Sequence, residues 1–416
     1  MEKYVINGGR KLNGSVKIES AKNSVLPILA ASILTDQPVV IKNCPKIEDV
    51  LSMIKILNSL GVKTLFEEEN LIVDSSVINS FSITEDLSKE LRSSVFMMGA
   101  LLSRLKMARL FFPGGCDIGL RPIDLHLSAL KELGVTVIEM NGEIVCRADN
   151  VRGREVYLDY PSVGATENVM LAAVTAQGKT EIHNPAKEPE IIDLMKFLNS
   201  MGAKIYGAGT STILIEGVKK LHGTEFLPMS DRIEAGTFLI AGAISGGEVQ
   251  ITNCQAKNIS SLLHKLCNNT CKVSIKDDII YLKSGVARKG FSFSTGPYPF
   301  FPTDLQAQTM ALLAVSEGVS VVTENVFEMR YKHVAELIKM GADLSVKGRT
   351  AIINGVSVLN GATVTAHDLR GGAALVLAGL NAIGQTTVED IKHVKRGYLD
   401  FDKKLRSLGA DIKILE

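Results

Sequence analysis

The sequence lacks both a strong net charge and the paired-cysteine patterns of disulfide-rich or zinc-binding proteins. Its 46 basic and 45 acidic side chains leave a formal net charge of +1 over 416 residues. This balance argues against a nucleic-acid-binding surface or a polybasic membrane surface, so any anion site must be a local cluster. The six cysteines include no CxxC pair, and a reducing cytoplasm is therefore the expected location.

Long hydrophobic segments are missing too. The longest apolar runs, at residues 25–34 and 373–380, fall short of the roughly 18 residues that a membrane-spanning helix needs. The N-terminal residues show no apolar core of a signal peptide. His264, Cys267 and Cys271 are metal-ligand types, but no fourth ligand is near and a plain turn separates the two cysteines. We therefore expect no membrane segment, no secretion signal and no metal site.

An internal repeat is what the chain does contain. One short phrase occurs six times, as LNSLGVK (57–63), LKELGVT (130–136), LNSMGAK (198–204), LHKLCNN (263–269), LIKMGAD (337–343) and LRSLGAD (405–411). Five copies predict an amphipathic helix that ends at a left-handed glycine and leads into a strand. In the weaker fourth copy, Cys267 stands where the others have glycine.

A second apolar helix and strand precede each phrase, so one unit reads helix, strand, helix, strand, with a further short strand before the next unit. Each unit is longer than the roughly 20–50 residues that are typical of solenoid repeats. We therefore expect an α/β protein of two closed domains with three units each, at residues 22–229 and at 1–21 plus 230–416. The cleft between two such domains is a common place for a ligand.

Polar side chains recur at equivalent places in the units. One set starts the first helix of each unit: Lys22, Asn23, Arg92, Ser162 to Thr166, Asp231, Asp304 and Arg370. A second set lies between a strand and the second helix: Arg121, Glu188, Glu190, Arg330 and Arg396. Helix N-termini and arginines bind anions, so these sets suit a substrate with several phosphate or carboxylate groups.

Single members of these sets also have plain structural explanations. The pairs Asp231 with Glu234 and Thr303 with Gln306 match capping boxes. His126 lies in an amphipathic helix pattern, where a histidine can be purely structural. It is the recurrence at equivalent repeat positions that favours a functional site.

The second unit departs from the repeat in the stretch FFPGGCDIGLRP, residues 111–122. A Pro-Gly-Gly break there places a thiol, Cys116, shortly before Arg121. Glycines free the backbone to swing, and the glycines and charges nearby argue against a buried structural thiol. With an ordinary thiol pKa of about 8.5, Cys116 is expected to be a mobile acid carried by a lid. Arg121 and Asp117 act on that pKa in opposite directions, so its protonation in an open state is undecided.

Several stretches together resemble one family. They are AKN (21–23), PGGCDIGLRPIDLH (113–126), SVGATEN (162–168), EPEI (188–191), DRIEAGTF (231–238), FPTDLQAQ (301–308), HDLRGGAALVLAGL (367–380) and RGY (396–398). In this order, along the whole chain, they resemble the UDP-N-acetylglucosamine enolpyruvyl transferases. The resemblance implies two inside-out α/β barrel domains, each of three βαβαββ-type units, with the active site in the cleft between them.

The same resemblance implies an activity. The family transfers the enolpyruvyl group of phosphoenolpyruvate to the 3-hydroxyl of UDP-N-acetylglucosamine and releases phosphate, by addition and elimination through a tetrahedral intermediate. This reaction is the first committed step of bacterial peptidoglycan synthesis. The resemblance implies no cofactor, no nucleic acid, no membrane and no obligatory protein partner.

Roles carry over residue by residue. The resemblance places at phosphoenolpyruvate the residues Lys22, Asn23, Arg121, Arg330, Arg370 and Arg396. It places at UDP-N-acetylglucosamine the residues Asn23, Arg92, Arg121, Pro122, Ile123, Asp124, Leu125, Ser162, Val163, Gly164, Asp304 and Val326. Cys116 takes the place of the proton donor that fosfomycin alkylates.

Elementary chemistry gives these residue types a purpose. Attack of a sugar hydroxyl on C2 of phosphoenolpyruvate requires a base for the hydroxyl and an acid for C3. Asp304 is the hypothesised base, and Cys116 is the hypothesised acid. Lys22 and the arginines, among them Arg396, would hold the anionic reactant and the charge that develops during transfer.

Three positions depart from the family pattern. Ser20 stands where members commonly have glycine, Tyr160 stands where some have lysine, and Cys267 interrupts the repeat glycine. We expect a stiffer segment at Ser20, no charged nucleotide contact at Tyr160 and a local structural change at Cys267.

Rival functions remain open at this point. A 5-enolpyruvylshikimate-3-phosphate synthase shares the fold and chemistry, but that family lacks such a cysteine loop and opens with a Ser-Lys-Ser stretch where this chain reads SAKNS (20–24). A catalytically silent sugar-nucleotide-binding paralogue has no chemical need for Lys22, Cys116, Asp304 and Arg396 together. A thiol hydrolase lacks a partnered histidine near the cysteine.

Overall fold

The computed structural model describes residues 2–114, 123–149, 151–285 and 287–416. The described chain folds into two compact units. Of these residues, the N-terminal unit comprises 20–114, 123–149 and 151–229, and the C-terminal unit joins residues 2–19 to 230–285 and 287–416. The N-terminal unit therefore begins at Ser20, whereas the predicted domain begins at Lys22.

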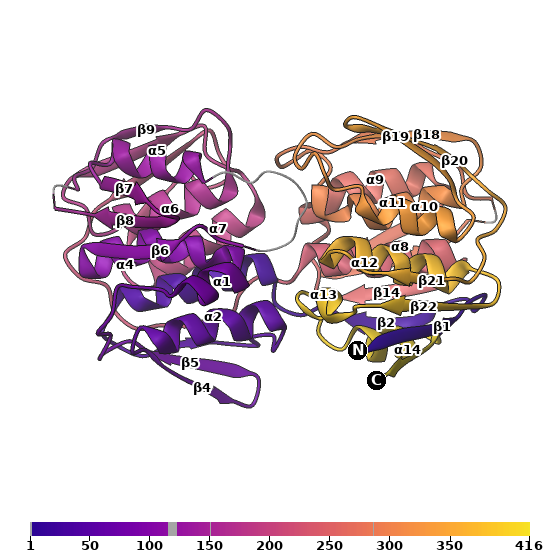
Figure 1. Cartoon of the computed structure of the whole chain (residues 1–416), viewed down its shortest axis with the longest axis horizontal. Coiled ribbons are helices and arrows are strands. Elements are labelled where there is room, and N and C mark those ends of the chain that lie inside the picture. Colours follow the sequence, from indigo (N-terminus) through magenta and orange to yellow (C-terminus); the bar gives the residue numbers. More distant parts are fainter. Residues whose placement is uncertain (1, 115–122, 150, 286) are drawn as a thin grey trace. The chain divides into compact units, whose positions relative to one another are not determined.

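The N-terminal unit contains three successive repeats of helices and strands (Figure 1). The first repeat has α1 (Lys22–Ala31), β3 (Val39–Ile41), α2 (Glu48–Ser59), β4 (Lys63–Glu67) and β5 (Asn70–Asp74). The second has α3 (Glu85–Glu90), η2 (Arg92–Phe96), α4 (Met97–Leu105), β6 (Met107–Phe111), α5 (Asp124–Glu132), β7 (Thr136–Met140) and β8 (Glu143–Arg147). The third has β9 (Glu155–Tyr157), α6 (Val163–Ala173), β10 (Lys179–His183), α7 (Pro189–Ser200), β11 (Lys204–Tyr206), β12 (Thr212–Glu216) and β13 (Glu225–Phe226).

The C-terminal unit repeats the same plan and adds the first strands of the chain, β1 (Lys3–Asn7) and β2 (Asn13–Lys17). Its first repeat has α8 (Arg232–Ser245), β14 (Glu248–Thr252), α9 (Ser260–Asn268), β15 (Lys272–Lys276), β16 (Ile279–Lys283) and β17 (Phe293–Ser294). Its second has η4 (Thr303–Leu305), α10 (Gln306–Ala314), β18 (Val319–Thr323), α11 (Lys332–Lys339), β19 (Asp343–Lys347), β20 (Thr350–Asn354) and β21 (Thr363–Thr365). Its third has α12 (Leu369–Asn381), β22 (Gln385–Glu389), α13 (Lys392–Lys395), α14 (Phe401–Ser407) and β23 (Asp411–Leu415).

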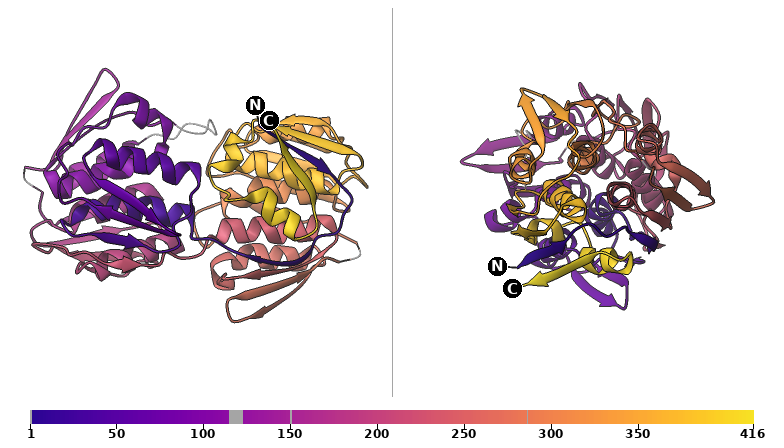
Figure 2. Two further views of the ribbon diagram at one scale, coloured as in Figure 1. Left: turned by 90° about the horizontal axis from the view of Figure 1, so that it is seen from below. Right: turned by 90° about the vertical axis from the view of Figure 1, so that its right-hand side faces the viewer.

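Within the described residues, the strands form six small sheets, and most sheets borrow a strand from another repeat. In the sheet β17-β18-β20-β19, for example, the short strand β17 from the preceding repeat pairs in parallel with β18. The short strand β13 ends the third repeat and pairs with β3 of the first, which closes the N-terminal unit on itself. Strand β1 lies between β22 and β23, and β2 pairs with β14. The two chain ends consequently lie side by side (Figure 2).

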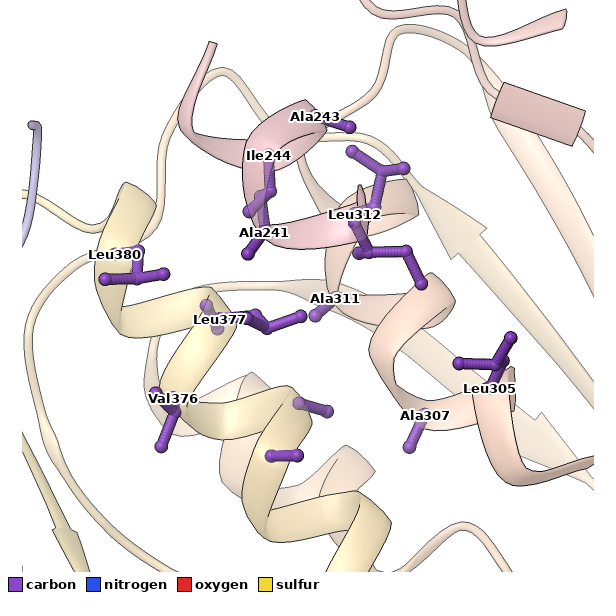
Figure 3. Packing of buried hydrophobic residues seen from close by; sticks show 14 of the residues in the cluster. Ala241, Ala243, Ile244, Leu305, Ala307, Ala311, Leu312, Val376, Leu377 and Leu380 are labelled. Carbon is purple, nitrogen blue, oxygen red and sulfur yellow. The ribbon is translucent and has the colours of Figure 1, made fainter. Parts of the chain in front are cut away.

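The helices that start each repeat form the core of each unit. In the C-terminal unit, α8, α10 and α12 pack on one another, and nearly every residue of the three is buried. A helix that is apolar all round must be surrounded by protein, so the sheets lie outside these helices. Figure 3 shows Leu377 of α12 pointing towards Ala311 of α10, below Ala241 of α8. This helix-inside arrangement is the inside-out α/β fold that the family resemblance implies.

Left-handed residues end the second helices of the repeats, as predicted for five of the six. Gly61, Gly134, Gly202, Gly341 and Gly409 have φ angles of 90°, 90°, 95°, 89° and 100°. The fourth copy shows the local structural change expected at Cys267. There α9 continues through Cys267 to Asn268, and Thr270, with φ 75°, is the left-handed residue at which the chain turns.

Asparagines after several first strands also adopt left-handed backbone. Asn184 and Asn253 have φ angles of 54° and 58°. Their amide groups donate to the carbonyls of Leu158 and Ile18 at 2.7 and 2.8 Å. Each asparagine thus turns the chain and ties it to the end of a neighbouring strand, which explains the recurrence seen in the sequence.

Candidate functional site

Asp304 forms the centre of a charged cluster in the C-terminal unit. It lies in η4, directly before α10. Its Oδ1 atom lies 2.7 Å from Nη2 of Arg330, and its Oδ2 atom lies 2.9 Å from Nη2 of Arg370. The side chains of the arginines are 5% and 2% exposed, against 23% for Asp304. The carboxylate is thus the more accessible part of a buried ion-pair triad.

Arg370 lies at the start of α12, where Asp368 caps the helix. The Asp368 carboxylate accepts from the backbone N–H groups of Arg370 and Gly371. The guanidinium of Arg370 lies over the ring of Tyr398, 5.4 Å from its centroid. Burial favours a neutral Arg370, but Tyr398 and Asp304 outweigh burial and raise the pKa of Arg370 above its ordinary value. Arg370 is therefore a fixed cation.

Arg330 follows β18 and precedes α11, as the second predicted set requires. Besides Asp304, it donates from Nη1 to the Thr303 hydroxyl at 2.8 Å. The predicted capping box of Thr303 with Gln306 is wrong, because Leu305 is the N-cap of α10 and no side chain caps it. The Thr303 hydroxyl instead donates to Glu324 at 2.9 Å. The Thr303 hydroxyl therefore makes tertiary contacts with Glu324 and Arg330 and does not cap α10.

Other predicted residues of this unit occupy helix ends. Asp231 caps α8 through the N–H groups of Ile233 and Glu234, which confirms the predicted cap. Arg396 follows α13 as its C-cap residue. The N–H of Val326 donates to Glu324 at 2.8 Å.

In the N-terminal unit, Lys22 is the first residue of α1 and Asn23 is the second. The Nζ atom of Lys22 lies 3.1 Å from Oδ2 of Asp49, near the start of α2, and the two side chains are 13% and 5% exposed. Arg92 starts η2, and burial lowers its pKa to about 10. This unit therefore presents cations at its helix starts, one of them anchored by a carboxylate.

The segment Ser162–Gly164 begins α6. The Ser162 hydroxyl caps this helix by accepting from the N–H of Ala165 at 3.3 Å. Gly164 lies against His126, because a Cβ atom at Gly164 would lie 2.6 Å from Cε1 of that ring. Asn168 donates to Nδ1 of His126 at 2.8 Å, so a hydrogen bond holds the imidazole, as the structural interpretation of this histidine expects.

The loop predicted to carry the acid lies outside the described residues, as do Cys116, Arg121 and Pro122. Of the neighbouring predicted contacts, Ile123 is buried and is the N-cap of α5, and Asp124 and Leu125 begin that helix. Residues 2–114, 123–149, 151–285 and 287–416 contain no group of three potential ligands placed to hold a metal ion, and no helix long and apolar enough to span a membrane.

Three side chains that contact the predicted residues were not predicted from the sequence: Asp49, Glu324 and Tyr398. Asp49 is separated from Lys22 along the chain, as Tyr398 is from Arg370. A signal existed for Asp49, which lies near the start of a second helix just as Arg330 does. The structure thus brings together Asp304, Arg330 and Arg370 in one unit, and Lys22 with Asp49 in the other.

Comparisons with known proteins agree with this architecture. The sequence profile of EPSP synthase (3-phosphoshikimate 1-carboxyvinyltransferase) matches residues 6–405. The chain is 52% identical to UDP-N-acetylglucosamine 1-carboxyvinyltransferase 2 of Caldanaerobacter subterraneus, over 99% of both chains. It is 48% identical to UDP-N-acetylglucosamine 1-carboxyvinyltransferase of Finegoldia magna, over 100% of this chain and 99% of that one.

Solved structures show the same fold. The enolpyruvyl transferase NikO of Streptomyces tendae matches with a TM-score of 0.90 and 26% identity, over 100% of this chain and 99% of that one. EPSP synthase of Acinetobacter baumannii matches all of both chains with a TM-score of 0.79 and 17% identity, which shows the fold alone. The chain belongs to the EPSP synthase family and, within it, to the UDP-N-acetylglucosamine 1-carboxyvinyltransferases.

Proposed function

We propose that this chain transfers the enolpyruvyl group of phosphoenolpyruvate to the 3-hydroxyl of UDP-N-acetylglucosamine and releases phosphate, in the cytoplasm, as the first committed step of peptidoglycan synthesis. Curated relatives about half identical over nearly the full chain carry the name of this activity. The rival function is that of EPSP synthase, which uses shikimate 3-phosphate as the acceptor. The solved EPSP synthase of Acinetobacter baumannii is only 17% identical to this chain.

The observation that best supports an anionic substrate is the state of the two arginines around Asp304. Their Nε atoms are buried and have no acceptor among the described residues. Buried N–H donors are normally satisfied, and a guanidinium fork matches a carboxylate or a phosphate. Arg330 and Arg370 therefore suit the carboxylate of phosphoenolpyruvate, and we place Lys22, Asn23, Arg121 and Arg396 around the rest of that substrate.

The addition step requires a base and an acid. Asp304 accepts the proton of the sugar 3-hydroxyl while that oxygen bonds to C2 of phosphoenolpyruvate. The electron pair of the C2–C3 double bond takes a proton from the Cys116 thiol, so C3 becomes a methyl group. The product of this step is a tetrahedral intermediate that carries both the sugar oxygen and the phosphate on C2.

The elimination step reverses the proton movements at C3. A proton leaves the methyl group, the C2–C3 double bond forms again, and the C2–O bond to phosphate breaks with the electron pair going to phosphate. The positive character at C2 and the departing charge are stabilised by fixed cations. Arg370, which its neighbours keep charged, is such a cation.

The sugar-nucleotide contacts are those that the family resemblance implies. We place at it Asn23, Arg92, Arg121, Pro122, Ile123, Asp124, Leu125, Ser162, Val163, Gly164, Asp304 and Val326. These roles, and the domain limits 22–229 and 1–21 plus 230–416, stay predictions. Fosfomycin is the expected covalent inhibitor, at Cys116.

Phosphate release tests the proposal directly. The purified chain is incubated with phosphoenolpyruvate and either UDP-N-acetylglucosamine or shikimate 3-phosphate, at pH values from about 6 to about 9, where such acids and bases titrate. Release with the sugar nucleotide alone supports the proposal. Release only with shikimate 3-phosphate selects the rival synthase, and binding of the sugar nucleotide without any release selects the silent paralogue. Asp304→Asn is the matched variant that should bind both substrates and turn over slowly.

A further inference from the structure

Glu324 is a fully buried carboxylate directly after β18. It accepts four hydrogen bonds from three separate segments of the C-terminal unit. A buried carboxylate is tolerated only when it is well paired or hydrogen-bonded, and charge-assisted hydrogen bonds are about twice as strong as neutral ones. Glu324 therefore holds the three segments that it contacts in fixed positions.

One oxygen of Glu324 holds the chain that follows it. Oε1 accepts from the N–H groups of Val326 and Phe327 at 2.8 and 3.0 Å, and from the Thr295 hydroxyl at 2.8 Å. These bonds fix the turn that leads from β18 to Arg330. The turn contains Val326, the residue assigned to the sugar nucleotide.

The other oxygen reaches the ion-pair triad through one hydroxyl. Oε2 accepts from Thr303 at 2.9 Å, and the same hydroxyl accepts from Nη1 of Arg330 at 2.8 Å. Because a hydroxyl has a single proton, donating it to Glu324 leaves the lone pairs of Thr303 facing Arg330. The chain of contacts then continues from Nη2 of Arg330 to Oδ1 of Asp304 at 2.7 Å.

We propose that Glu324 is a positioning residue for the transfer reaction. Through the Thr303 hydroxyl, Oε2 of Glu324 orients Arg330 towards Asp304, and its Oε1 atom fixes the turn that contains Val326. The inference rests on the proposed function, because it concerns the residues that would hold the substrate and accept the hydroxyl proton. The effect of Glu324 on Arg330 passes through Thr303, so a change at either residue should disturb the same ion pair.

Substitutions can separate the contacts of Oε1 from the contact that Oε2 makes with Thr303. In Glu324→Gln, the amide oxygen can keep the three Oε1 bonds, whereas the amide nitrogen meets the Thr303 hydroxyl as a donor and leaves its proton without an acceptor. Thr303→Val removes only the hydroxyl that links Glu324 to Arg330. Thr303→Ser keeps the hydroxyl and both of its bonds. Thr309→Val, a buried helical threonine whose hydroxyl donates to the Leu305 carbonyl, is the matched control.

The experiment measures kcat and KM for both substrates, the pH profile of kcat, and thermal unfolding for the wild-type chain and the four variants. Small displacements of catalytic groups cost up to about 100-fold in rate. We therefore expect Thr303→Val and Glu324→Gln to lower kcat by about 10- to 100-fold, with Thr303→Ser and Thr309→Val within about threefold of wild type. Once Arg330 is no longer held against Asp304, the carboxylate loses a stabilising cation and the acid limb of the kcat profile should move to higher pH.

The outcomes are distinct. A loss of kcat in Thr303→Val that Thr303→Ser restores, with the shifted acid limb, supports the positioning role. Equal losses in Thr303→Ser and Thr303→Val, or losses that follow the unfolding temperature with an unchanged pH profile, overturn it in favour of a purely structural carboxylate. Full activity of Glu324→Gln overturns it as well. If the wild-type chain itself releases no phosphate with UDP-N-acetylglucosamine, the proposed function fails first, and the positioning role for that reaction fails with it.

Discussion

The guanidinium carbon of Arg370 lies 5.4 Å from the centre of the Tyr398 ring. The guanidinium thus lies over the face of the ring, while its Nη2 atom donates to Asp304 at 2.9 Å. A lysine at this position has neither the flat face nor the fork of donors. We therefore expect the site to require an arginine at position 370, and not merely a positive charge.

Arg370→Lys should lower kcat/KM for phosphoenolpyruvate by about 100-fold, because one preorganised donor at developing charge is worth about that much. Steady-state phosphate release measures the effect. Arg406→Lys is the control, since Arg406 is 47% exposed and pairs with Asp402 four residues earlier in the same helix. It should change the rate by less than about twofold, because exposed pairs contribute little. Similar losses in both variants would contradict the role of the guanidinium plane.

Gly99 tests the close packing of the central helices of the N-terminal unit. A Cβ atom there would lie 2.4 Å from the carbonyl oxygen of Asn168, on the neighbouring helix α6. Gly99→Ala must push α4 and α6 apart, and we expect it to lower the free energy of unfolding by about 1–3 kcal/mol or more. Urea unfolding followed by circular dichroism measures this. In Gly384→Ala, the methyl group meets open space and only the φ angle of 88° is strained, so a loss of about 1 kcal/mol is expected.

His333 should make the folded chain sensitive to acid. Its imidazole is buried, and neither ring nitrogen has a hydrogen-bond partner among the described residues. Burial is the main cause that lowers its pKa from 6.5 to about 4; Asp368 opposes this shift and Arg330 adds to it. Between these two pH values the unfolded chain binds a proton that the folded chain does not. The stability that neutral His333 contributes is therefore complete above pH 6.5 and is lost as the pH falls to about 4.

The size of this effect follows from the shift, and is about 3 kcal/mol at most. His333→Gln should flatten the fall in the free energy of unfolding across that window, whatever its effect at neutral pH. Urea unfolding at a series of pH values gives the slope. His264→Gln, which replaces an exposed histidine, should keep the wild-type slope. An unchanged slope in His333→Gln would show that other groups account for the acid sensitivity.

Local patterns predicted the helix starts well, because these depend on short-range physics. Lys22 and Arg370 lie in the first turns of their helices as expected, and Asp231 caps α8 with the N–H groups that a capping box supplies. The glycine repeat also had a local cause, since a left-handed residue is needed where each second helix turns into a strand. Counting these units gave two closed domains of three units each, and the family resemblance implied their inside-out arrangement.

The errors arose where tertiary contacts decide. Thr303 matched a helix cap, yet Glu324 and Arg330 take its hydroxyl. Tyr398 was missed, since nothing near it in sequence indicates that Arg370 lies against its ring. Such partners are set by how repeats pack, and a single sequence does not record this.

The cysteines give the sharpest chemical prediction. Burial raises the pKa of Cys44, Cys146 and Cys254 to about 12 and that of Cys271 to about 11. Only the thiolate is nucleophilic, so these four thiols should react slowly with iodoacetamide at pH 8. Cys267 is exposed and should react without loss of activity, because it lies on α9 and contacts none of the proposed site residues that the structure describes.

In a Cys267→Ala background, modification at Cys116 should therefore be separable from all other labelling. We expect peptide mass spectrometry to find one rapid adduct, at Cys116, whose formation runs parallel to the loss of phosphate release. Fosfomycin should give an adduct at the same residue, and Cys116→Ala should abolish both adducts. Because the thiol is the proposed acid for C3, activity that survives complete modification of Cys116 would remove it from the mechanism. Rapid labelling of Cys44 or Cys254 would instead show that the core around these thiols opens readily.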